Sequence, residues 1–374
     1  MTRGVNRNGL DFTINLSIIG TMELSAVIVQ SPLTLFLGAG ASQPLGKPTM
    51  RPFVQALFEN MSKAKDQHLP LFSHLAATCE NDLENILGEL DAIISLKSAQ
   101  SASMFYNGRY QEIESSVARA LRTAIEYAVI QQYSEIPQPQ LVEVYGPLFE
   151  LIFSKLDSSR YCLPIFTTNY DTAIEEFCEL YENYHLVDGF RATGRDYAWD
   201  PAQFHRFAIV PNKRNIVLFK LHGSVNWTFV KSKNAILRTQ PFHQMIDAAK
   251  YRNVLIYPAT HKVATDEPFF TAYDYYGRCC EHAEVLLTIG YSFRDYDALA
   301  RLRSAMSVNP TLRVALLAPD CKEVLQRLPI DHHREIPLEL FFGNKATAAQ
   351  FSGAISKLLS SLTSTTTSTS PRIG

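Results

Sequence analysis

The sequence lacks the long apolar run of a membrane protein and the basic excess of a nucleic-acid-coating protein. No stretch of its 374 residues reaches about 18 uninterrupted apolar residues. The fairly apolar residues 12–29 precede a poor cleavage signal, so we expect no secretory signal. The net charge is −2, from 35 Lys and Arg against 37 Asp and Glu. We therefore expect no membrane association and no direct binding of nucleic acid.

The six cysteines lack the spacing of a structural zinc site. They are Cys79, Cys162, Cys178, Cys279, Cys280 and Cys321, and no two of them form C-x-x-C. Scattered single cysteines are typical of buried thiols in a reducing compartment, so we expect a cytoplasmic protein. The adjacent pairs His332-His333 and Cys279-Cys280 are poorly spaced for one metal. A metal hydrolase is thus a weak alternative, and no metal is expected.

The sequence has the composition of an ordinary globular protein, with 46% apolar and 19% charged residues. Its length fits two to three domains, or one large α/β domain with an insertion. Apolar runs at 33–37, 162–167, 216–221, 254–257, 285–289 and 313–317 predict strands, the last of which completes the sheet. Helices are expected at about 51–64, throughout 80–135, at about 145–156 and 172–181, and from Tyr296, whereas 184–215 looks irregular. This alternation predicts an open parallel sheet that binds ligands at the carboxyl ends of its strands.

A glycine-rich turn follows the first predicted strand. It reads Gly38-Ala39-Gly40-Ala41-Ser42, with Gly46-Lys47-Pro48-Thr49 extending the loop. Glycines let a backbone approach a pyrophosphate closely, and free N–H groups supply hydrogen-bond donors. A purely structural turn is the alternative. The spacing G-x-G-x-x-G is absent, which argues against an ordinary dehydrogenase.

Three further predicted strands end in polar or glycine turns. In Thr167–Asp171, the Asn169 amide is a candidate partner for a sugar or a water, although Asn169 or Asp171 could merely cap the next helix. His222 ends another strand and is a candidate general base, although a lone histidine is more often structural. In Gly290–Phe293 the turn precedes Asp295 and Asp297, either of which could cap a helix.

Together these motifs resemble those of the sirtuin superfamily. The matching pieces are GAGAS (38–42), G-x-P (46–48), TTNYD (167–171), LHGS (221–224) and GYS (290–292), which span residues 33–300. Protein-deacylating sirtuins carry a four-Cys zinc module after the catalytic histidine, and it is missing here. Their D-F-R is replaced by Thr49-Met50-Arg51, and the long helical block is also unlike them. These departures resemble the bacterial sirtuin-like NAD hydrolases of anti-phage defence.

The resemblance implies an α/β, sirtuin-type Rossmann-like parallel sheet with a large helical insertion. The NAD-binding domain would span 32–345, with the insertion at about 53–160. An N-terminal extension (1–31) would precede it, and a C-terminal helix with a disordered Ser/Thr-rich tail (346–374) would follow. The implied reaction converts NAD+ to nicotinamide and ADP-ribose and so depletes cellular NAD. Asn169 and His222 would be catalytic, and NAD+ would be bound by Gly38, Ala39, Gly40, Ser42, Thr49, Asp171, Gly290 and Ser292.

The same resemblance implies partners but no cofactor beyond NAD+, and no zinc. Unrestrained NAD hydrolysis would kill the host cell, so activity must be gated. No second sensor domain is obvious, which favours a separate partner: first a HerA-type ATPase, second a short Argonaute. A homo-oligomer is also expected. A protein deacylase and a non-catalytic nucleotide sensor are the alternatives. The resemblance does not specify the trigger, and it allows either linear or cyclic ADP-ribose as the product. Met1 and Met22 are the two candidates for the natural start.

Overall fold

The computed structural model describes residues 26–95, 101–106, 109–239, 250–255, 266–328 and 334–339, together with residues 353 and 356. Residues 1–25, most of the predicted segment 346–374, and the pair His332-His333 lie outside the described residues. Within the described part of the chain, no helix combines the length and the apolar character that crossing a bilayer requires.

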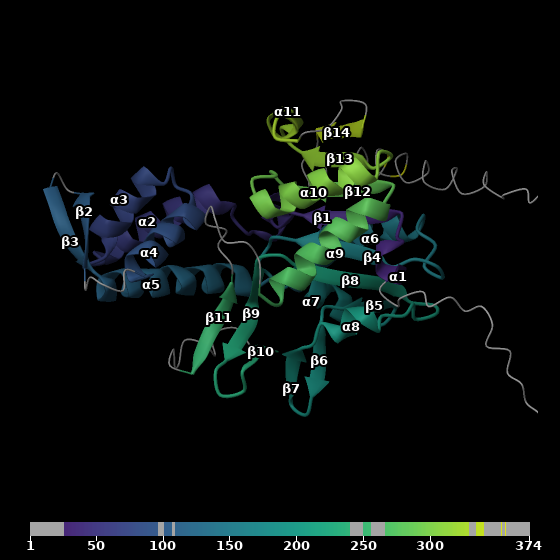
Figure 1. The fold of residues 1–374 in the computed structure, drawn as a ribbon, viewed down its shortest axis with the longest axis horizontal. Coiled ribbons are helices and arrows are strands. Elements are labelled where there is room, and N and C mark those ends of the chain that lie inside the picture. Colours follow the sequence, from purple (N-terminus) through teal and green to yellow (C-terminus); the bar gives the residue numbers. More distant parts are fainter. Residues whose placement is uncertain are drawn as a thin grey trace, which may run out of the picture.

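The main sheet is parallel, as the sequence predicts, and has seven strands (Figure 1). In spatial order they are β14 (Glu335–Glu339), β13 (Arg313–Ala318), β12 (Val285–Ile289), β1 (Leu33–Leu37), β4 (Leu163–Thr167), β8 (Arg214–Lys220) and β5 (Tyr184–Val187). The central strands are mostly apolar and buried at every position because both faces of the sheet are covered. The fold is therefore α/β with a Rossmann-like parallel sheet.

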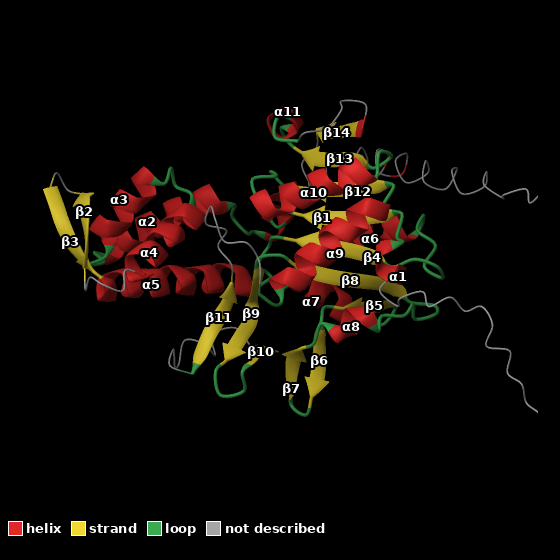
Figure 2. Cartoon of the chain, in the orientation of Figure 1, coloured by secondary structure: helices red, strands yellow, loops and turns green. Residues whose placement is uncertain are grey.

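Helices cover both faces of this sheet (Figure 2). Side chains alternate along a strand, so Phe36 of β1 packs on one side while Leu35 and Leu37 pack on the other. The Phe36 side holds α1 (Ala26–Val29), α8 (Ala202–His205), α9 (Phe269–His282), α10 (Tyr296–Val308) and α11 (Cys321–Leu325). The opposite side holds α6 (Gln138–Phe153) and α7 (Ala173–Glu179).

Four helices form a lobe with a hydrophobic core of its own, which Figure 1 shows beside the sheet. They are α2 (Met50–Ala64), α3 (Leu69–Thr78), α4 (Leu83–Ser95) and α5 (Ser115–Ser134). The prediction that 80–135 is helical throughout is wrong, because β2 (Ser101–Tyr106) and β3 (Arg109–Glu114) form an antiparallel hairpin. The sequence Asn107-Gly108 between them is a strong hairpin signal, and here it outweighs the helical pattern on either side.

A second, antiparallel sheet takes two of its strands, β6 (Phe190–Thr193) and β7 (Asp196–Trp199), from the segment 184–215 that was expected to be irregular. Its order is β11 (Tyr251–Leu255), β9 (Gly223–Val230), β10 (Ala235–Arg238), β7 and β6. β6 and β7 are only four residues long and form a hairpin whose outer partner, β10, comes from a distant segment, so local periodicity does not reveal them. The main sheet also continues beyond the predicted last strand, because β14 pairs with β13.

Helix α6 begins seven residues earlier than the predicted helix at 145–156. Its first turn contains Pro139, which lies in the gap between the helices expected at 80–135 and at 145–156. A proline in the first turn of a helix removes no intrahelical hydrogen bond, so Pro139 starts a helix here. Because α6 packs on the sheet, it belongs to the core opposite α9 and not to the core of the helical lobe.

Candidate functional site

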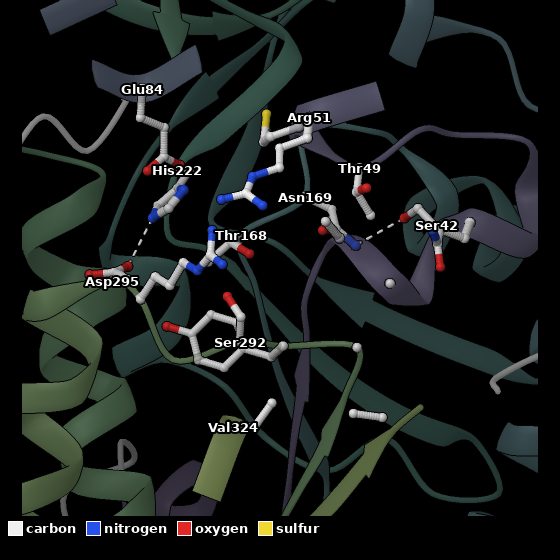
Figure 3. Close-up of a pocket in the computed structure, with 18 of the residues that line it drawn as sticks. Ser42, Thr49, Arg51, Glu84, Thr168, Asn169, His222, Ser292, Asp295 and Val324 are labelled. Atoms are coloured by element: carbon white, nitrogen blue, oxygen red, sulfur yellow. Dashed lines mark hydrogen bonds and ion pairs between the residues drawn. The ribbon is translucent and has the colours of Figure 1, made fainter. Parts of the chain in front are cut away.

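The order of the strands reverses between β1 and β12. From β1 the chain moves to β4 and β8 on one side, and it later returns to β12, β13 and β14 on the other. Such a switch point leaves a crevice at the carboxyl ends of the strands. A pocket of about 450 Å³ lies there, within the usual range for ligand sites. It is lined by the turns after five strands and by residues of the helical lobe (Figure 3).

Nine of the ten predicted site residues line this one pocket. They are Ala39, Gly40, Ser42, Thr49, Asn169, Asp171, His222, Gly290 and Ser292. Gly38 is not among the lining residues; its carbonyl accepts a hydrogen bond from Asn169. In the register of the sheet, Leu37 pairs with Thr167 and Ile289, and Thr167 pairs with Lys220. These strands therefore end side by side. Residues far apart in the sequence therefore meet.

The glycines of the two central turns are required by backbone packing. Gly40 N–H donates to the Gly290 carbonyl at 3.0 Å. A Cβ built on Gly290 would lie 2.4 Å from the Gly40 Cα, and Gly290 has a φ of +61°. The free N–H groups expected in this loop are partly absent, because those of Gly40, Ala41 and Ser42 all bind backbone carbonyls. These glycines thus bring two strand ends into contact, and the three N–H groups are not free for a pyrophosphate.

Asn169, Ser42 and Asp171 form a buried network behind the pocket. The Asn169 amide nitrogen donates to Ser42 Oγ and to the Gly38 carbonyl, each at 2.9 Å. Ser42 donates in turn to Asp171 Oδ2 at 2.6 Å. Asp171 also accepts from the Ala173 N–H, so its helix-terminal role is real but not exclusive. Figure 3 shows the amide nitrogen of Asn169 turned to Ser42 and its oxygen on the other side, facing the pocket.

His222 is held between the two sheets. β8 ends at Lys220 and β9 begins at Gly223, whose φ of +86° and contact with Val254 leave no room for a side chain. The imidazole is only 4% exposed. Its Nε2 lies 2.9 Å from Asp295 Oδ2, and that oxygen also accepts from the Tyr273 hydroxyl at 2.6 Å. The histidine is thus buried, oriented and paired with a carboxylate.

Asp295 both caps helix α10 and pairs with His222. Its Oδ1 caps α10 by accepting from the N–H groups of Asp297 and Ala298, as the sequence allowed. Burial lowers the pKa of His222, but the hydrogen bond and charge of Asp295 outweigh it and raise that pKa above its ordinary value. Burial likewise raises the pKa of Asp295, and the hydrogen bond and charge of His222 outweigh it and lower that pKa. The pair therefore favours its charged form.

Replacing Asp295 with asparagine is expected to destabilise the fold in a pH-dependent way. Folding lowers the pKa of Asp295, so its contribution is present above its ordinary value of about 4. Folding raises the pKa of His222, so that contribution is complete below about 6.5 and disappears as pH rises through the folded value. Urea unfolding should show the largest loss between these values and a smaller loss at pH 9. The cap survives, because asparagine also caps helices.

The matched control is Asp274→Asn, an exposed aspartate of α9 whose closest cation is Arg278 at 3.7 Å. It should change stability little at either pH. An equal loss for Asp295→Asn at pH 5.5 and pH 9 would show that the charge pair with His222 is not the cause.

The structure adds pocket residues that the sequence did not single out as site residues. Glu84 enters from the first turn of α4, and Arg51 and Arg294 line the pocket as cations. Figure 3 places the Arg51 guanidinium between His222 and Asn169 and the Glu84 carboxylate beside His222, on the other side of the ring from Asp295. Burial raises the pKa of Glu84 to about 7. No local signal marks Glu84, because only packing of the lobe on the sheet brings it here.

The described residues contain no group of three or more His, Cys, Asp or Glu side chains arranged to hold a metal ion. All six cysteines are described and carry free thiols, five of them buried. Burial raises the pKa of the Cys162, Cys279 and Cys280 thiols, so these groups favour the neutral form.

The SIR2-like domain family matches residues 164–334, somewhat less than half of the chain. This segment begins in β4, ends just before β14, and contains Asn169, His222 and Gly290 but not the Gly38 turn. A search of the curated proteins finds no match.

Several solved structures are similar to this chain. A mutant Sir2 homologue with ADP-ribose is 14% identical, with 91% of this chain and 98% of that chain covered and a TM-score of 0.42. A second mutant with 2′-O-acetyl-ADP-ribose is 15% identical, with 91% and 98% covered and a TM-score of 0.40. A Sir2 homologue with NAD is 13% identical, with 90% and 94% covered and a TM-score of 0.40. The fold class follows from the strand order instead, because these TM-scores lie below 0.5. What the comparisons show is thus a similarity of residues 164–334 to the SIR2-like domain family.

Proposed function

We propose that this protein is an NAD+ glycohydrolase, which converts NAD+ and water to nicotinamide, ADP-ribose and a proton. The observation that carries the proposal is the convergence of Asn169 and His222 on one pocket at the switch point of the sheet. An amide oxygen facing a pocket can orient a ribose hydroxyl or a water. A buried imidazole fixed by a carboxylate is suited to act as a general base.

Cleavage of NAD+ depends more on stabilising the positive charge that develops on the ribose than on acid catalysis. Nicotinamide carries a positive charge in NAD+, so it leaves as a neutral molecule when it takes the electron pair of the C1′–N bond. The sugar then resembles an oxocarbenium ion, as in glycoside hydrolysis. Carboxylates that line the pocket, among them Asp82, Glu84 and Asp295, favour that cation. Arg51 and Arg294 supply positive charge for the two phosphates.

The segment after His222 weighs against a protein deacylase. The sequence contains no cysteine between His222 and Cys279, where deacylating sirtuins carry their four-Cys module. The described part of this segment forms the antiparallel strands β9, β10 and β11 and the first part of α9. A peptide tunnel organised by zinc has no counterpart in this arrangement.

The direct test is to incubate the pure protein with NAD+ and to measure nicotinamide and ADP-ribose by chromatography. We expect Asn169→Ala to lower the rate about a hundredfold, because the substrate loses an orienting partner. Asn60→Ala, an exposed change on α2, is the matched control and should keep full activity. NAD+ binding without turnover would instead favour a nucleotide sensor, and unchanged activity in Asn169→Ala would contradict the site.

We further propose that hydrolysis is gated by a separate protein in the cytoplasm and depletes NAD during anti-phage defence. A HerA-type ATPase is the first candidate partner and a short Argonaute the second, with this chain as a homo-oligomer. The NAD+ assay is therefore run on the chain alone and with each candidate, and light scattering reports the assemblies. Turnover that neither partner changes would contradict the gating.

A further inference from the structure

Glu84 is the pocket carboxylate whose position is hardest to explain by folding alone. It lies in the first turn of α4, between Leu83 and the pair Ile86 and Leu87, all of which are buried in the core of the helical lobe. The Asp82 side chain accepts from the Glu84 and Asn85 N–H groups at 3.0 and 3.2 Å. Both the helix packing and this cap fix the Glu84 backbone at the rim of the pocket.

The Glu84 side chain itself has no hydrogen bond or ion pair among the described residues, although it is mostly withdrawn from solvent. Four charged or titratable groups act on it: His222 after β8, Arg294 and Asp295 just before α10, and Asp82 just before α4. Burial dominates and raises the pKa of Glu84 to about 7. An unpaired, largely buried carboxylate lowers stability, so its place beside a catalytic candidate points to chemistry.

One ring nitrogen of His222 is not used in the pair with Asp295. Nε2 is paired with Asp295, which leaves Nδ1 as the nitrogen that can exchange a proton. Figure 3 shows the Glu84 carboxylate on the side of the ring away from Asp295. Asp295 cannot take up the exchanged proton readily, because its pKa is lowered. Glu84 can, because it changes charge near neutral pH.

We propose that Glu84 is a proton-accepting group of this pocket, which receives from His222 the proton released when water attacks the ribose. The inference rests on the proposed NAD+ hydrolysis. The C1′–N bond breaks and its electron pair leaves with nicotinamide, while the water oxygen forms the new bond to C1′. One water proton passes to His222 Nδ1 and then to the Glu84 carboxylate, and solvent removes it after the products leave. Glu84 acts through His222 and is therefore a positioning residue, which holds the proton until solvent removes it.

The first test compares the pH–rate profiles of the wild type and Glu84→Gln with NAD+. In the wild type, both Glu84 and His222 must lose a proton, so the acidic limb of log kcat against pH approaches a slope of two. Glu84→Gln should lower kcat at least tenfold at pH 8, leave KM within about twofold, and reduce that slope to one. Glu84→Asp should give an acidic limb with a slope between one and two. The matched control is Glu89→Gln, an exposed change on the same helix. An unchanged profile in Glu84→Gln, with an active wild type, overturns the proposal alone.

The second test needs no turnover and therefore separates the two proposals. The ring signals of His222 are followed by NMR against pH in the free protein, assigned with His222→Gln. The wild type should show two steps, one of them near pH 7 and absent from Glu84→Gln. A single step that Glu84→Gln leaves in place overturns the role of Glu84. A wild type that never hydrolyses NAD+, with or without a partner, overturns the proposed function instead.

Discussion

Replacement of His222 by alanine is expected to lower the rate of NAD+ hydrolysis by about a hundred- to ten-thousandfold, the usual contribution of a positioned base. The imidazole is 4% exposed, sits between two strands and is oriented by Asp295 at 2.9 Å. No other histidine lines the pocket formed by the described residues. The attacking water would then lose its proton acceptor, and Asp295 would lose its partner. Chromatographic assay of nicotinamide and ADP-ribose measures the effect.

Two comparisons show whether this loss is chemical. His282→Ala changes an exposed histidine at the end of α9 and should leave the rate unchanged. Calorimetric binding of ADP-ribose to His222→Ala should stay within a few fold of the wild type, because the loss concerns the transition state. A His222→Ala protein that binds ADP-ribose and still hydrolyses NAD+ at the wild-type rate would remove His222 from the mechanism.

Gly290→Ala is expected to destabilise the protein by about 2–5 kcal/mol. A left-handed backbone costs about 1–2 kcal/mol for a residue with a side chain. Overpacking adds about 1–3 kcal/mol, because the new methyl group would lie 2.4 Å from the Gly40 Cα and 2.6 Å from the Ala41 nitrogen. These neighbours are backbone atoms, so no flexible side chain can move aside. The turns after β1 and β12 would separate, so binding of NAD+ should weaken with stability.

Gly46→Ala isolates the backbone part of this effect. Gly46 also has a positive φ, +76°, but an added Cβ there meets nothing within 4 Å. Its cost should therefore be limited to about 1–2 kcal/mol, and pocket geometry should be preserved. Urea unfolding of both variants measures the difference. Equal losses at Gly46 and Gly290 would contradict the view that backbone contact between the two turns holds the switch point together.

Local sequence patterns predicted the strands that end at the pocket. The run at 285–289 is β12 as observed, and the runs at 33–37 and 313–317 match β1 and most of β13. A buried parallel strand is a short apolar segment followed by glycine or polar residues, and both signals are local. Asn169 and His222 could be chosen for the same reason, because each directly follows such a segment.

Other features depended on contacts between distant segments. In the antiparallel sheet, β7 pairs with β10 and β9 pairs with β11, which joins segments well apart in the sequence. The glycines looked like a cradle of free N–H groups, but the Gly40 N–H binds the Gly290 carbonyl of the neighbouring turn, and those of Ala41 and Ser42 bind carbonyls of their own turn. Asp295 looked like a helix cap, and the structure adds its bond to His222 across 73 residues.

The amino-acid pattern alone thus established an α/β chain with its polar residues at strand ends, because burial and turn formation act over a few residues. The order of the strands, the His222–Asp295 pair and the place of Glu84 came only from the folded chain. The pKa shifts of the pocket residues depend on these same features of the folded chain. A pKa depends on burial and on charges brought close in space, and Glu84 lies 138 residues (222 − 84) from His222 in the sequence.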